Sequence, residues 1–182
     1  MREDVLMRLI SWQTVLSKAL GYIGIGNYLC KQNPSEVATV EAAGRSHKTF
    51  FALEAEQGLH LAAVVLFRQV FSNGRGSPAS GIANNYDDEI ERIRERMEQH
   101  TVTALALPQA DYDSLMANVA SQRNELLAHY DGDKADFRRP IPEITAMKIA
   151  GSVRLMPDDV EILAKVILTM HNFVQNEICT RK

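Results

Sequence analysis

Apolar residues recur along the N-terminal part of the chain at steps of three and four, the period of one face of an α-helix. From residue 5 to residue 23 they are Val5, Leu9, Trp12, Leu16, Leu20 and Ile23. This pattern predicts a first helix that runs into a glycine cluster at Gly21, Gly24 and Gly26, where we expect either the end of the helix or a close packing contact. Strand-like alternation is scarce throughout, which favours an all-α fold.

The same period predicts a long helical segment over residues 36–70, open to a break at Gly44 or Gly58. The Gly-, Ser- and Asn-rich residues 72–85 are typical of a loop. A helix over residues 87–100 has only a thin apolar stripe, so we expect it to lie on the surface, with its arginines in solvent. The stripe consists of Ile90, Ile93 and Met97, and the arginines are Arg92, Arg94 and Arg96.

Two further helices are expected in the C-terminal half, over residues 111–128 and 157–178, with a short helical piece after Pro142. Pro157 suits the first turn of the last helix. That helix is apolar on almost every side, which predicts full burial in the bundle or at a seam between two copies. The segments together predict an all-α bundle of about five helices, forming a single domain over residues 1–182.

Composition limits the function classes without choosing among them. The chain has 182 residues and a net charge of −3, which argues against a broad basic surface that would coat a nucleic acid. Cys30 and Cys179 have no Cys or His neighbours at zinc-site spacing, so no metal or cofactor is expected and both thiols are predicted to be reduced. The acidic N-terminus lacks a signal-peptide pattern, and no apolar run reaches membrane-spanning length. We therefore expect a cytoplasmic protein.

The densest group of polar residues is the segment 123–131, RNELLAHYD, at the end of a predicted helix. On an ideal helix Arg123 falls in the same arc as Leu115, Val119 and Leu126, where a cation needs a partner. His129 lies about 120° around the helix from Arg123 and about 9 Å along its axis. The two could line one groove if the helix frays near His129.

This segment resembles the motif of HEPN domains, and most closely the form found in HEPN proteins linked to abortive infection. The family pattern is an arginine with a polar neighbour, followed four to six residues later by a histidine, and Arg123, Asn124 and His129 match it. The superfamily consists of all-helical bundles, usually dimeric, and many members are metal-independent endoribonucleases or toxins. The resemblance implies a homodimer, an RNA substrate and, for a toxin, a cognate antitoxin as partners.

The resemblance also implies roles for the three motif residues. His129 would act as general acid or base, because imidazole titrates near neutral pH. Arg123 would hold the scissile phosphate, and Asn124 would orient either the histidine or the phosphate. A basic cluster behind the motif could bind the RNA backbone, and it consists of Lys134, Arg138 and Arg139.

Two other interpretations stay open. Arg123 could form a salt bridge with Glu54 or Glu56 while His129 caps helix carbonyls, which would leave a bundle without an active site. A non-catalytic helical module could instead use the same groove for RNA, a nucleotide or a protein. The remaining histidines of the predicted helices, His60 and His171, are expected to serve packing.

Overall fold

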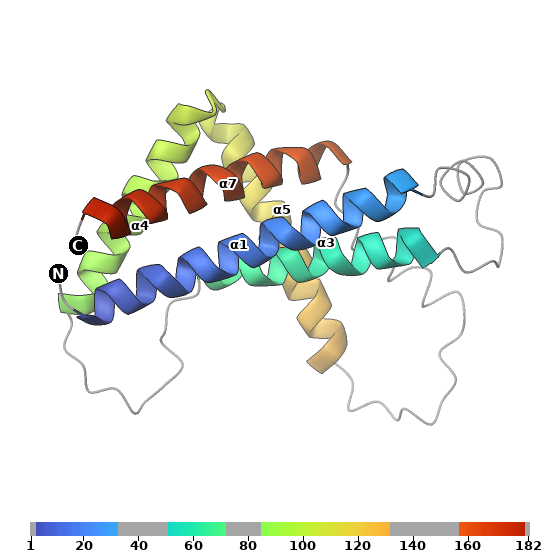
Figure 1. The fold of residues 1–182 in the computed structure, drawn as a ribbon, viewed down its shortest axis with the longest axis horizontal. Helices are drawn as coiled ribbons and strands as arrows, with labels where there is room; N and C mark the ends of the chain where they lie inside the picture. The colour runs from blue at the N-terminus through green and yellow to red at the C-terminus, as the bar shows by residue number, and fades with distance from the viewer. Residues whose placement is uncertain (1–2, 33–50, 72–84, 132–156, 181–182) are drawn as a thin grey trace.

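The computed structural model describes residues 3–32, 51–71, 85–131 and 157–180, and these ranges contain five α-helices and no strand (Figure 1). The helices are α1 (Glu3–Gln32), α3 (Phe51–Gln69), α4 (Asn85–Ala104), α5 (Gln109–Asp131) and α7 (Pro157–Thr180). The predicted all-α class is confirmed. The predictions for residues 36–50, for most of the 72–85 loop and for the piece after Pro142 fall outside the described residues.

The long helix α1 runs between α3 and α7 and packs along both (Figure 1). Its buried face follows the predicted steps, with Val5, Leu9, Trp12 and Leu16 almost completely covered. The expectation that the helix could end at the glycine cluster is wrong, because α1 continues without interruption to Gln32. After Gly21 the helix continues for eleven residues, so α1 extends along the whole of α3.

One continuous apolar core joins all five helices in the described part of the chain. The large side chains Trp12, Phe67, Met97 and Leu163 are buried there, and α5 adds Tyr112 with two aliphatic residues on its own buried face. Burial of apolar surface at about 25 cal/mol per Å² is the main favourable contribution to such a fold. The helices are therefore held by side chains that are far apart in sequence.

Helix α4 lies on the surface of the bundle with its thin apolar stripe turned inward, as predicted. Ile90, Ile93 and Met97 are all buried in the core, because α4 lies against α7 and touches the start of α1. Across the outer edge of this contact, Arg96 forms an ion pair with Glu177 of α7 at 3.1 Å. Three apolar residues are sufficient because α4 crosses its neighbours instead of running beside them (Figure 1).

A tight corner connects α4 to α5. Ala106 has a φ of 48°, the left-handed conformation that usually falls to glycine at a helix C-terminus. The Ala106 amide donates to the Thr103 carbonyl at 3.2 Å, and the Leu107 amide donates to the Val102 carbonyl at 3.1 Å. These bonds satisfy the last carbonyls of α4, so the chain can reverse direction within a few residues and begin α5.

The last helix, α7, is not buried on all sides as its composition suggested. Its core face is covered through Val160, Leu163, Met170 and Val174. On the opposite side Leu168 keeps 49% of its surface exposed. Leucine is common in exposed helical positions, since much of any protein surface is apolar.

Gly26 marks a close approach of α1 to α3. A Cβ at this position would lie 3.2 Å from Nε2 of His60 and 3.4 Å from the Cα of Glu56. Beside it, Nε2 of His60 donates a hydrogen bond to Oδ1 of Asn27 at 3.0 Å. The predicted close packing contact is thus found at Gly26, and His60 links two helices instead of filling the apolar core.

Gly26→Ala is expected to be less stable than Gly58→Ala by about 1 kcal/mol or more, because overpacking forces neighbours apart. Gly58 lies on α3, and no atom lies within 4 Å of the place that an alanine methyl group would take there. Both variants therefore gain the same helix propensity, but only in Gly26→Ala does the new methyl group press against another residue. Urea unfolding of the two variants measures the difference. Equal stabilities would show that α1 and α3 do not touch at Gly26.

Candidate functional site

The motif residues Arg123, Asn124 and His129 all lie within helix α5. The helix extends to Asp131, two residues beyond His129, so the expected fraying at the histidine is not found. On a regular helix the backbone positions of Arg123 and His129 are about 9 Å apart along the axis and about 120° apart around it. The side chains of residues 122–131 lie outside the described part of the structure, as do Lys134, Arg138 and Arg139.

The first half of α5 anchors the motif to the bundle. Tyr112, Leu115 and Val119 are buried, as their spacing predicted, where α5 packs against α3. Arg123 follows Val119 by four residues, which places its backbone on the same face of the helix. Figure 1 shows the last turns of α5 continuing beyond the point where it crosses α3. The motif therefore begins on the packed face and ends on turns that extend past the crossing.

Arg94 of α4 packs against the aromatic ring of Trp12. Only 11% of the Arg94 side chain is exposed, although this residue was expected in solvent. Its guanidinium lies 6.0 Å from the ring centre of Trp12 and forms an ion pair with Glu91 at 3.2 Å. The long apolar stem of arginine can pack on an aromatic ring while its charged end meets a carboxylate, which explains the correction.

Burial alters the chemistry of Tyr112, near the start of α5. Desolvation raises the pKa of its hydroxyl, and the nearby carboxylates of Glu98 and Asp113 raise it further. The hydroxyl is buried and has no hydrogen-bond partner in the structure, and the same is true of Trp12 Nε1. A phenol in this setting stays protonated at any physiological pH, so Tyr112 serves packing and is not a candidate base.

Glu98 of α4 makes the stability of the folded chain depend on pH. Burial raises the pKa of its carboxyl, Arg94 opposes the rise, and the carboxylates of Glu91, Glu95 and Asp113 add to it. Glu98 therefore binds its proton more tightly in the folded chain than in the unfolded chain. The stability that this provides is present at acid pH and is lost as the pH rises through the folded-state pKa.

Glu98→Gln is accordingly expected to be more stable than the wild type at neutral pH, with the difference shrinking as the pH falls through the raised folded-state pKa and vanishing once the pH is below the ordinary carboxyl pKa. Glutamine resembles the protonated carboxyl in shape and carries no charge to desolvate. Urea unfolding of both proteins over a pH series measures the difference. A difference that stays constant across the series would contradict the raised pKa.

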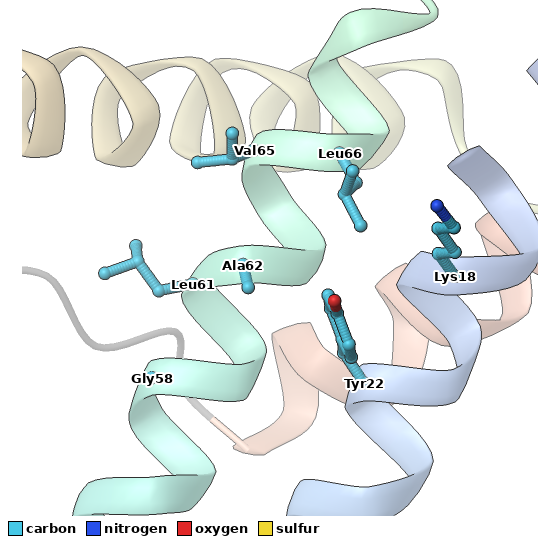
Figure 2. Close-up of a pocket in the computed structure, with 7 residues that line it drawn as sticks. All are labelled: Lys18, Tyr22, Gly58, Leu61, Ala62, Val65 and Leu66. Carbon is cyan, nitrogen blue, oxygen red and sulfur yellow. The ribbon is translucent and has the colours of Figure 1, made fainter.

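A shallow hollow of about 450 Å³ lies between α1 and α3 (Figure 2). Leu61, Ala62, Val65 and Leu66 of α3 form most of its wall, and Figure 2 shows Lys18 and Tyr22 extending from α1. Gly58 is its other lining residue among those that the structure describes. The sequence pattern missed this hollow because its residues come from two helices whose relative position only the packing determines.

The described residues offer little support for other chemistry. No three His, Cys, Asp or Glu side chains among them lie together as metal ligands would. His100 is exposed and its ring lies 5.4 Å from that of Phe173, while His171 is half-buried on α7. Cys179 is an exposed free thiol. Within the same ranges no helix is long and apolar enough to cross a bilayer.

Comparison of the chain with models of known protein families, with curated proteins and with solved structures finds no match. The residues of the segment 123–131 and their helical backbone are therefore the basis for a functional proposal.

Proposed function

We propose that the chain is a metal-independent endoribonuclease of toxin or defence type, acting in the cytoplasm at a small site around Arg123, Asn124 and His129. The observation that supports this most is that all three residues, in the order and spacing of the motif that they resemble, lie on the single helix α5.

The proposed reaction uses the 2′-hydroxyl of RNA as the nucleophile. His129 takes the 2′-hydroxyl proton, the 2′-oxygen bonds to phosphorus, and the bond from phosphorus to the 5′-oxygen breaks as that oxygen receives a proton. Arg123 stabilises the negative charge on the phosphoryl oxygens through its planar set of donors. Asn124 orients the imidazole or the phosphate.

A second copy of the chain would complete this site. The backbone positions of Arg123 and His129 lie about 120° apart around the axis of a regular α5, so a single copy places them on different faces of the helix. A two-fold axis brings like surfaces together, and a cleft at that axis would contain both groups. We propose that RNA enters such a dimer cleft, that Lys134, Arg138 and Arg139 bind its backbone, and that a cognate antitoxin would cover it.

The charge distribution of the described residues supports a small site over a long RNA footprint. On α4, Arg94 is buried against Trp12 and Arg96 is paired with Glu177, so neither belongs to an open basic face. With a net charge of −3 for the whole chain, long-range attraction of RNA is weak.

The second candidate function is a non-catalytic helical module that binds RNA, a nucleotide or a protein through the same part of α5. The regularity of α5 as far as Asp131 favours it, because without fraying the two motif side chains start from different faces. Incubation of the purified chain with single-stranded RNA, and with DNA of the same sequence, separates the two functions. The proposal predicts cleavage of RNA and not of DNA, whereas a binding module would shift RNA in a gel and leave it intact.

A further inference from the structure

One face of α1 carries apolar residues that nothing in the described structure covers. Met7 and Tyr28 are each 60% exposed, Ile25 is 52% exposed and Ile10 is 40% exposed. These four residues include all the large exposed hydrophobic side chains of α1 and all but one of those in the described residues. They lie at the two ends of a single stripe, opposite the core face of the helix.

Small residues fill the middle of this stripe. Thr14, Ser17, Gly21 and Gly24 are all exposed, and they continue the spacing of three and four that begins at Met7. We call the whole set, from Met7 to Tyr28, the α1 stripe. Its spacing is a heptad pattern, the one by which two helices pack along a seam, and none of its positions is charged.

The two glycines of the α1 stripe have no explanation among the described residues. No atom of these residues lies within 4 Å of the position that a Cβ would occupy at Gly21 or Gly24, in contrast to Gly26, which faces His60. A glycine inside a helix costs about 1 kcal/mol relative to alanine. A helix backbone that approaches closely from outside this copy would account for their presence.

The charges at the ends of α1 indicate which partner fits. Glu3 and Asp4 form an acidic first turn, and Lys31 is in the last turn. An antiparallel second copy of α1 would bring the acidic end of each helix near the basic end of the other and would oppose the two helix dipoles favourably. A parallel copy would instead place like charges together.

We propose that the α1 stripe pairs with the α1 stripe of a second copy of this chain, antiparallel, about a two-fold axis near Ser17 and Gly21. In this register Ile10 meets Tyr28 of the second copy, and the small central residues allow the backbones to approach closely. The large residues at the two ends then cover one another. The pair is self-complementary in both shape and charge, as a two-fold interface requires.

This surface is distinct from the motif. Helix α5, which carries Arg123 and His129, packs on α3, and α1 packs mainly between α3 and α7. The inference therefore goes beyond the proposed RNA cleavage and does not depend on it. If both surfaces associate, the chain would form a tetramer with two kinds of two-fold interface.

Gly21→Glu tests the proposal, with Gly58→Glu as the matched control. Both changes place the same charged, helix-favouring residue where no atom of the described residues lies within 4 Å, so both proteins are expected to fold. Sedimentation velocity should show the mass of the assembly halved in Gly21→Glu and unchanged in Gly58→Glu. The dissociation constant of the pair should rise at least about tenfold. The proposal would be overturned if the wild type is monomeric at every concentration, or if Gly21→Glu leaves the mass of the assembly unchanged.

Charge exchange tests the antiparallel arrangement. Glu3→Lys and Lys31→Glu should each weaken association, and the double variant should restore it, because the opposite charges are then exchanged between the two ends. Circular dichroism confirms that each variant keeps its helices. If the single variants weaken association and the double variant does not recover it, the partner of the α1 stripe is not an antiparallel second copy.

Discussion

Replacing His129 by alanine is expected to reduce the rate of RNA cleavage by about 10²-fold or more, the usual contribution of a general acid or base. The imidazole removes the 2′-hydroxyl proton in the proposed reaction, and alanine offers no group that can. The change lies in the last turns of α5, beyond its buried residues Tyr112, Leu115 and Val119, so the fold should survive. Cleavage of a labelled RNA by the wild type and the variant, prepared identically, gives the ratio.

His100→Ala is the matched control, because it replaces the same residue type at another position. His100 is exposed on α4, a different helix from that of the motif, and His100→Ala should cleave RNA at the wild-type rate. Circular dichroism and thermal unfolding establish that His129→Ala is folded. A folded His129→Ala protein with full activity would exclude the catalytic role, and equal losses in both histidine variants would indicate a contaminating nuclease or a general effect on the protein.

Trp12→Ala is expected to lower the free energy of unfolding by about 3–5 kcal/mol, the range observed for large aromatic residues truncated in a core. Trp12 is 1% exposed on α1 and lies beneath the guanidinium of Arg94 from α4. Truncation leaves a cavity and also removes the ring on which Arg94 packs. Because whole domains are stable by only about 5–15 kcal/mol, the loss is a large part of the total.

Trp12→Phe serves as the graded control, since phenylalanine keeps an aromatic ring and most of the apolar surface. Its loss should be clearly smaller than that of Trp12→Ala in urea unfolding. Near-equal values for the two variants would mean that the ring is not packed as the structure shows, and that α4 is not held against α1 at this point.

Periodicity was informative where a helix has one broad apolar face. The steps from Val5 to Ile23 and the buried arc of Tyr112, Leu115 and Val119 depend only on local spacing, and both are predicted by it. The helix over residues 111–128 is predicted for the same reason, and α5 continues three residues beyond that range to Asp131. Local spacing determines which side of a helix is apolar, independent of what covers it.

Features that depend on a distant partner could not be read from local spacing. Arg94 looked solvated among alternating charges, yet it packs on Trp12, which is remote in the sequence. Gly26 follows Ile23 by three residues and lies on the buried face of α1, whereas Gly21 and Gly24 lie on the exposed face. Spacing along α1 separates these two faces, but it does not show that His60 of α3 stands opposite Gly26.

The candidate site also combines features that local spacing determines with features that depend on a distant partner. The order and spacing of Arg123, Asn124 and His129 are properties of the sequence, and α5 converts them into fixed backbone positions. The expected fraying at His129 was wrong because helix α5 continues to Asp131. In the proposed function, completion of the site depends on a second copy, whose position is a property of assembly.

The chemical ends of the RNA products test the proposed function most directly. Attack by the 2′-hydroxyl, with His129 as base and no metal, predicts fragments that carry a 2′,3′-cyclic phosphate and a 5′-hydroxyl when the wild-type chain is incubated with RNA in EDTA. Mass spectrometry of the fragments identifies these groups. Fragments with 5′-phosphate ends, or cleavage that appears only after Mg²⁺ is added, would contradict the proposed reaction.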